Sequence, residues 1–235
     1  MPAGAACGIV SAMFVRLVLL LATFLLPGVV LAQEFVTVPR RLSDEGFYRL
    51  VACAAPPGGA CAKPMIRWPE ARRLSLSVGI VRVDPSFPGY KLDLVDAAID
   101  RALAEINASG AYLVVERSYE AGPDLALYLL DTPQDGVIAQ TSSSLLDGSD
   151  LPIGRVAIRS VGTEIQEAAI AISRDIGRRE IASVVLEELV QALGLPTDVR
   201  SPAYRDSIFN EDFNSVVWLR GQDAEALRRH YPPLR

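Results

Sequence analysis

The sequence predicts a sandwich of the α+β class, with the α/β class as the alternative, and three observations support this prediction. Residues 74–81 alternate apolar and polar side chains, as a half-buried strand does. Residues 90–107 carry apolar side chains at helical spacing and form the longest segment of this kind. Four further strand-like runs then precede a second helical segment. The order strand, helix, strands, helix is typical of a sheet covered by helices.

The N-terminus has the features of an export signal. A single basic residue, Arg16, precedes a long apolar run, and the small residues Val30 and Ala32 suit signal-peptidase cleavage before Gln33. No later segment approaches the roughly 20 apolar residues that a membrane-spanning helix needs. We therefore expect residues 1–32 to be removed and the mature protein to be periplasmic or secreted, with no membrane segment.

The mature chain, residues 33–235, is expected to form one domain preceded by an irregular arm. Residues 33–73 lack sustained periodicity and contain several prolines and glycines, so the domain proper is expected over residues 74–235. Cys53 and Cys61 flank the loop AAPPGGA, which brings its ends together easily. We expect these two cysteines to form a disulfide in an oxidising compartment. The alternative, a metal or redox pair, fits poorly because no histidine is nearby.

One long helix and two more strands are expected before residue 131. The apolar positions of the helix are Leu92, Val95, Ile99, Ala102, Leu103 and Ile106. Ser109 and Gly110 are expected to end this helix. The β-branched and aromatic content of residues 111–119 predicts the next strand, and residues 124–130 the one after it.

The second half of the chain is expected to hold a loop, two strands and a helix. Residues 131–152 are polar and rich in turn formers, which predicts a long surface loop. Residues 155–160 and 164–173 are expected to be strands. A second helix is expected over about 177–193, with Gly194 as its C-terminal stop.

The second helix ends in VVLEELVQALGLPTD, residues 184–198, which resembles the zinc-binding helix of metzincin peptidases. That family carries HExxHxxGxxH, in which two histidines four residues apart share a helical face and the glycine turns the chain toward a third. On this pattern Glu188 stands at the catalytic glutamate and Gly194 at the glycine. The three histidine positions are occupied by Glu187, Gln191 and Thr197.

The resemblance extends along the chain, over about residues 66–233. DSIFNED, from Asp206, is similar to the turn that places a methionine beneath the zinc, with Phe209 at the methionine position. LRGQDAEALRRHYPP resembles the last helix of the matrixin branch. The pattern EELxQxLGLxxD is also similar to that of an uncharacterised proteobacterial family of exported proteins, a domain of unknown function. The resemblance implies a metzincin-like sandwich: a mixed twisted sheet with a long helix, a degenerate active-site helix, a C-terminal helix and a cleft above the sheet.

The residues at the former ligand positions do not suit zinc. Catalytic zinc is typically held by three imidazole, thiolate or carboxylate groups of the protein, and only Glu187 is a good ligand here. The single histidine of the chain, His230, is expected at the surface near the C-terminus. Without a metal, Glu188 has no polarised water to deprotonate. We therefore expect no metal and no cofactor.

A polar network is expected in place of the metal. Glu187 and Gln191 lie one helical turn apart, so a hydrogen bond between their side chains is expected. Buried charge is costly unless it is paired, and the nearest cations in the sequence are Arg200 and Arg205.

The expected function is therefore binding and not catalysis. We expect an exported, inactive metalloprotease-like protein that acts as a binding or structural module and holds a peptide or protein in the former substrate cleft. The alternative is a hydrolase that uses carboxylates or a non-zinc metal at Glu187 and Glu188, although adjacent helical side chains point about 100° apart.

Removal of Arg16 with the signal changes the formal charge from −5 to −6, which disfavours nucleic acid as a partner. The oligomeric state is left open. The candidate binding residues are Glu187, Gln191, Gly194, Thr197, Asp198 and Phe209.

Overall fold

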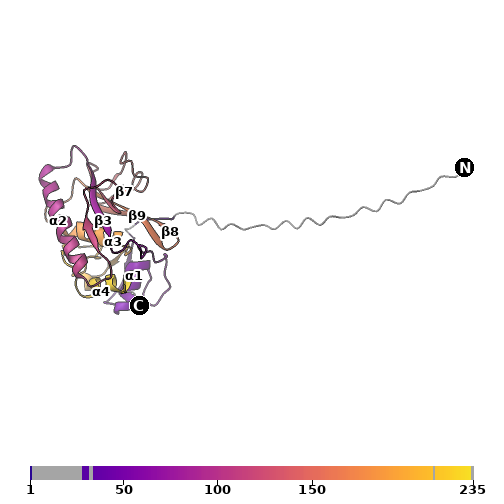
Figure 1. Cartoon of the computed structure of the whole chain (residues 1–235). Helices are drawn as coiled ribbons and strands as arrows, with labels where there is room; N and C mark the ends of the chain where they lie inside the picture. Colours follow the sequence, from indigo (N-terminus) through magenta and orange to yellow (C-terminus); the bar gives the residue numbers. More distant parts are fainter. Residues whose placement is uncertain (2–27, 32–33, 214, 234–235) are drawn as a thin grey trace.

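The computed structural model describes residues 1, 28–31, 34–213 and 215–233 of the chain (Figure 1). Most of the expected export signal, and Gln33 after it, lie outside the described residues. Within the described part, no helix has both the length and the apolar content needed to cross a membrane.

A mixed sheet forms the centre of the fold, in the order β1-β8-β9-β5-β3-β4. Strands β4, β3, β5 and β9 are parallel to one another, whereas β8 is antiparallel to β9 and β1 is antiparallel to β8. Together with the four helices, this sheet confirms the α+β class. The strands span Gly28–Leu31 (β1), Leu76–Val83 (β3), Val115–Arg117 (β4), Leu125–Leu130 (β5), Gly154–Val161 (β8) and Glu164–Ser173 (β9).

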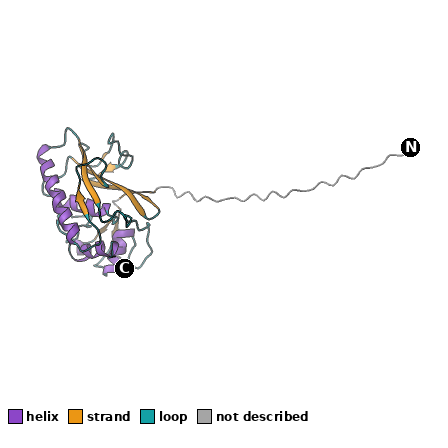
Figure 2. Ribbon diagram, viewed as in Figure 1, coloured by secondary structure: helices purple, strands orange, loops and turns teal. Residues whose placement is uncertain are grey.

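Helices α2 and α3 contact each other and cover one face of the sheet (Figure 2). Helix α2 spans Gly89–Ala108 and confirms the expected long helix, because its periodic apolar face is buried against the strands. Helix α3 spans Ile181–Ala192 and is buried on nearly all sides. Helix α4, Gly221–His230, packs against α1 at the end of the chain.

The prediction of an irregular arm over residues 33–73 is wrong for two segments. Strand β2, Glu34–Thr37, pairs in parallel with β10, Thr197–Arg200. Helix α1, Asp44–Cys53, begins after Ser43, whose Oγ accepts a hydrogen bond from the Gly46 amide at 3.2 Å. A short helix with an internal glycine gives a weak local signal, and α1 is stabilised instead by its apolar face in the common core.

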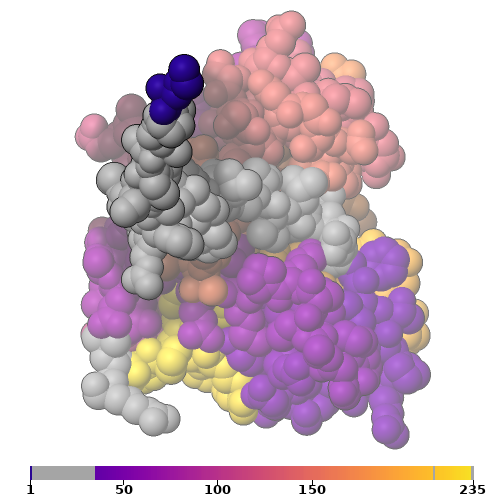
Figure 3. All heavy atoms as spheres, turned by 90° about the vertical axis from the view of Figure 1, so that its right-hand side faces the viewer, coloured from indigo at the N-terminus to yellow at the C-terminus, as the bar shows by residue number. Residues whose placement is uncertain are grey.

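The expected surface loop over residues 131–152 covers the second face of the sheet. It contains a short hairpin, β6 (Gly136–Val137) with β7 (Asp150–Leu151). Its leucines and one isoleucine are buried in a small second cluster with alanines of β8 and β9. The scattered leucines between serines and glycines gave no period that would have predicted this packing. In Figure 3 this segment occupies the upper part of the visible face, coloured salmon.

The expected disulfide between Cys53 and Cys61 is present and ties the end of α1 to the following loop. Opening this bond is expected to lower the free energy of unfolding by about 2 to 3 kcal/mol, because the cross-link restricts a short loop in the unfolded chain. Urea unfolding of the oxidised protein and of the Cys53→Ala/Cys61→Ala variant measures the difference. Equal unfolding midpoints for the two proteins would contradict this expectation.

Candidate functional site

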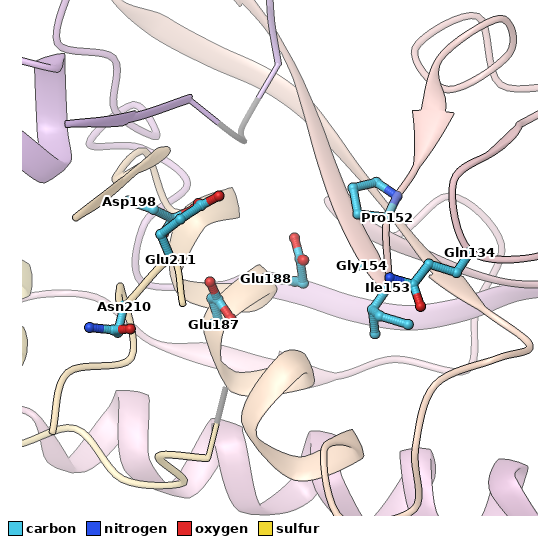
Figure 4. Close-up of a pocket in the computed structure, with 9 residues that line it drawn as sticks. All are labelled: Gln134, Pro152, Ile153, Gly154, Glu187, Glu188, Asp198, Asn210 and Glu211. Carbon is cyan, nitrogen blue, oxygen red and sulfur yellow. The ribbon is translucent and has the colours of Figure 1, made fainter. Parts of the chain in front are cut away.

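A cavity of about 340 Å³ lies where β8, α3 and β10 meet (Figure 4). Its volume falls within the range of ligand sites in proteins. We call it the acidic cavity, because four carboxylate side chains line it. Its lining residues are Gln134, Pro152, Ile153, Gly154, Glu187, Glu188, Asp198, Asn210 and Glu211.

Helix α3 brings two adjacent glutamates to the cavity, and the turn after the helix brings the aspartate. The helix begins at Ile181, later than the expected 177, because residues 177–180 form a turn in which Glu180 Oε2 accepts from the Gly177 amide at 3.0 Å. It stops at Gly194 as expected, since this residue has a φ of +99°. The chain then enters β10 and places Asp198 at the cavity wall.

Gly154 lets the backbone of β8 lie directly against the side chain of Glu188. A Cβ atom at this position would overlap Glu188 Oε1 and would lie 2.8 Å from Val184 Cγ1. The hydrogen of glycine therefore leaves the space that the carboxylate fills. Figure 4 shows Glu188 in the middle of the site, with Gly154 on one side and Asp198 and Glu211 on the other.

The buried polar atoms of the site are mostly hydrogen-bond acceptors. Gln191 Nε2 donates a hydrogen bond to Asp198 Oδ1 at 2.9 Å. The side-chain amide of Gln191 therefore binds Asp198, in addition to sharing a helical face with Glu187. Three buried oxygen atoms have no hydrogen-bond partner among the described residues: Glu188 Oε2, Gln191 Oε1 and Thr197 Oγ1. Of these three residues only Glu188 lines the cavity, and its unpaired Oε2 favours a ligand that brings an N–H group.

The nearby cations differ from those expected. Arg200 pairs with Glu211 at 3.2 Å and with Asp212 at 3.0 Å, at the outer side of the cavity. Arg205 lies over the ring of Phe213, 4.7 Å from its centre. The cations that act on the inner carboxyls are instead Arg155 on β8, which attracts Glu188, and Lys63, which attracts Asp198. Both are far from α3 in the sequence.

Burial makes both inner carboxyls hard to ionise. It raises the pKa of Glu188 well above its ordinary value, and the charge of Asp198 raises it further, against the attraction of Arg155. Burial likewise raises the pKa of Asp198 to about 8, with a further increase from Glu211, although the hydrogen bond from Gln191 lowers it. At neutral pH the site therefore retains protons that exposed carboxyls would have released.

His230 is buried, and the expectation of a surface histidine is wrong. Its Nε2 lies 2.9 Å from the Ile66 carbonyl oxygen and its Nδ1 lies 3.4 Å from the Tyr48 hydroxyl. Burial lowers the pKa of His230 to about 3, so the ring is neutral near pH 7. The run of basic residues at the end of α4 gave no indication of which member turns inward.

The structure gathers only part of the predicted site. Glu187, Glu188 and Asp198 line the cavity, and Gln191 joins it through Asp198. Thr197 is buried beside them, Gly194 forms the turn, and Phe209 packs in the core with its ring centre 5.9 Å from that of Phe47. The sequence reasoning missed Gln134, Pro152, Ile153, Gly154, Asn210 and Glu211. Only Asn210 and Glu211 had a signal, since they belong to the DSIFNED turn.

The former zinc positions do not fit zinc. Among the described residues, no group of three or more histidine, cysteine, aspartate or glutamate side chains converges as metal ligands would. Glu187 offers a carboxylate, but Gln191 and Thr197 offer a neutral amide and a hydroxyl, which bind this ion weakly.

Residues 133–234 match a family model described as a protein of unknown function (DUF2927). A search of the curated proteins found no match. The matched range contains every residue that lines the acidic cavity. The chain is thus similar to this family over the whole of the candidate site, and the expected domain of unknown function agrees with the match.

Proposed function

We propose that this chain is an exported, metzincin-like binding module that holds an extended peptide along the outer edge of β8, beside the acidic cavity, and does not cleave it. The pairing of β1 with β8 carries the proposal. Gly28 lies opposite Ser160 and Leu31 opposite Ala157, in an antiparallel ladder. This edge therefore accepts an extended chain through backbone hydrogen bonds, which is the way strand addition binds peptides.

In the proposed function, removal of the export signal exposes the outer edge of β8. Strand β1 falls within residues 1–32, the segment that we expect signal peptidase to remove. Its removal leaves the backbone groups on the outer side of β8 without their partner. Unpaired edges of this kind are ready templates for another strand.

The arrangement of the sheet supports the metzincin-like interpretation. Once β1 is removed, the parallel strands are followed at this edge by a single antiparallel strand, β8, which contacts α3. A cleft between such an edge strand and the degenerate helix is what the resemblance implies. Loss of the zinc ligands removes the chemistry of the cleft without removing the backbone groups that align a peptide.

The alternative function is hydrolysis by carboxylates, and the raised pKa values of Glu188 and Asp198 favour it. Carboxyls held protonated in a cavity are common in acid–base sites. The same shifts arise in any buried, donor-poor cluster, so the fate of a bound peptide distinguishes the two functions.

A peptide-binding measurement on residues 33–235 tests the proposal. A fluorescein-labelled peptide of sequence GVVLAA, which repeats β1 and extends it by alanines, is expected to bind with a measurable increase in anisotropy. A matched peptide with both valines replaced by proline is expected to bind at least about ten-fold more weakly, since proline lacks the N–H of the ladder.

Two results would count against the proposal. Equal binding of the valine and proline peptides, or no binding of either, would show that the edge of β8 does not hold a strand. Mass spectrometry of the peptide after long incubation is expected to find it intact. Cleavage products that disappear in Glu188→Gln would establish the hydrolase instead.

A further inference from the structure

The acidic cavity lies next to the start of β8, just past the residues of β8 that pair with β1. In the ladder, Leu31 lies opposite Ala157, and a peptide that continues in the same direction runs toward the start of β8. The third residue after the one at the Leu31 position therefore lies opposite Gly154. We call this peptide position the Gly154 position.

A side chain at the Gly154 position points toward Glu188. Residues directly opposite each other on antiparallel strands project to the same face of the sheet. The missing Cβ of Gly154 would point at Glu188 Oε1, so this face is the one that carries the cavity. Because Gly154 has no side chain of its own, nothing at this pair blocks the path of the ligand side chain.

The cavity suits a cationic donor. Glu188 is only 5% exposed, and its Oε2 has no hydrogen-bond partner among the described residues. The remaining wall is also mostly acidic, since it contains the carboxyl groups of Glu187, Asp198 and Glu211 beside the side-chain amides of Gln134 and Asn210. An ammonium group brings three N–H donors and a guanidinium group brings five, each with a positive charge that suits a wall with four acidic side chains.

A bare metal ion suits the cavity less well. The described carboxylates do not converge in a group of three, as a hard cation would require. The volume of about 340 Å³ corresponds to roughly ten water molecules, which is room for the head and stem of a long side chain.

From this geometry we infer that the acidic cavity selects peptides with lysine or arginine at the Gly154 position, an inference that rests on the proposed function. The backbone ladder supplies binding, and the buried carboxylates supply the preference among peptides. The protein is thus a receptor for extended segments that contain a basic residue.

The protonation of the site links this selection to pH. The charged groups that face Glu188 and Asp198 are Arg155 from β8, Lys63 from the loop after α1, and Glu211. Arg155 and Lys63 lower the pKa of these carboxyls less than burial and the neighbouring carboxylates raise it, so both pKa values stay raised. A ligand cation favours the ionised carboxyls, so binding releases protons and the preference for lysine increases as the pH rises toward 8.

Three peptides that differ at one side chain test the inference. They have the sequence GVVLAAXA, where X is lysine, norleucine or glutamate, and norleucine keeps the stem of lysine without its charge. With residues 33–235, the lysine peptide is expected to bind at least about ten-fold more tightly than the norleucine peptide, and the glutamate peptide most weakly.

Protein variants locate the preference in the cavity. Glu188→Gln and Glu211→Gln each remove one cavity carboxylate and are each expected to reduce the ratio between the affinities of the lysine and norleucine peptides. Glu120→Gln removes an exposed carboxylate beyond β4, at the opposite edge of the sheet, and is expected to keep the full ratio. Two independent cavity variants keep the test valid if one of them fails to fold.

The outcomes separate the two proposals. Equal binding of the lysine and norleucine peptides would overturn the selection while leaving the binding module in place. Absence of binding by all three peptides would overturn both. Displacement of the lysine peptide by calcium chloride, but not by sodium chloride of equal ionic strength, would show a metal site and would also overturn the inference.

Discussion

At pH 8, the Asp198→Asn variant is expected to be more stable to unfolding than the parent protein by roughly 3 to 5 kcal/mol. Burial raises the pKa of Asp198 from 3.8 to about 8, so the folded state resists an ionisation that the unfolded state undergoes freely. An asparagine keeps the shape of the side chain, and its oxygen can accept the hydrogen bond from Gln191. It carries no charge that burial would penalise.

The sign of the pH dependence follows from the direction of the shift. The contribution of Asp198 to stability is complete below about pH 4 and is lost as the pH rises to about 8. Glu188 and Asp223 act in the same direction, since burial raises the pKa of Asp223 to about 7. His230 acts in the opposite direction, but only below pH 6.5, because its pKa is lowered from 6.5 to about 3.

The window from pH 6.5 to 8 therefore isolates the carboxyls. In this window the parent protein is expected to lose stability with rising pH. The slope for Asp198→Asn should be shallower by about 1.4 kcal/mol per pH unit at pH 6.5 and by about half of that at pH 8. Urea unfolding at several pH values across the window measures both slopes. The exposed control Glu120→Gln should follow the parent, and parallel lines for Asp198→Asn and the parent would refute the raised pKa.

The second large effect is expected for Gly194→Ala, which should lower the free energy of unfolding by roughly 3 to 6 kcal/mol. The φ of +99° at Gly194 is unfavourable for alanine. The new Cβ would also overlap the Ile66 carbonyl oxygen and lie 2.7 Å from His230 Nε2. It would thus separate two buried groups that hydrogen-bond to each other at 2.9 Å.

Gly162→Ala is the matched control for this variant. Gly162 also has a positive φ, +61°, but a Cβ there meets no atom within 4 Å. The control should therefore lose only the backbone term, about 1 kcal/mol. Thermal or urea unfolding of both variants compares the two losses, and equal losses would mean that the turn at Gly194 can relax away from Ile66 and His230.

Local sequence patterns correctly predicted the features that depend on residues near one another in the chain. The period of residues 90–107 predicted α2, the run 164–173 predicted β9, and the glycine after α3 predicted its end. The loop between Cys53 and Cys61 predicted their bond because its length and composition determine that its ends meet. Each of these features depends on residues close together in the chain.

The missed features depend on partners far away in the chain. Strand β2 is a strand only because β10 lies beside it, and α1 is stable because its apolar face packs in the core. The same applies to the site. The sequence pointed to Glu187, Glu188 and Asp198 through one motif, but only the crossing of β8 over α3 brings Gly154 to Glu188. The burial of His230 also depends on such a crossing, with the segment around Ile66.

The single hydrogen atom that serves as the side chain of Gly154 leaves room for the carboxyl of Glu188 at the wall of the acidic cavity. Gly154→Ala replaces that hydrogen with a methyl group, the smallest enlargement that a codon change can make. The methyl group would overlap the carboxyl of Glu188 and displace it. A substitution at Gly154 would thus change the shape of the acidic cavity through one side chain.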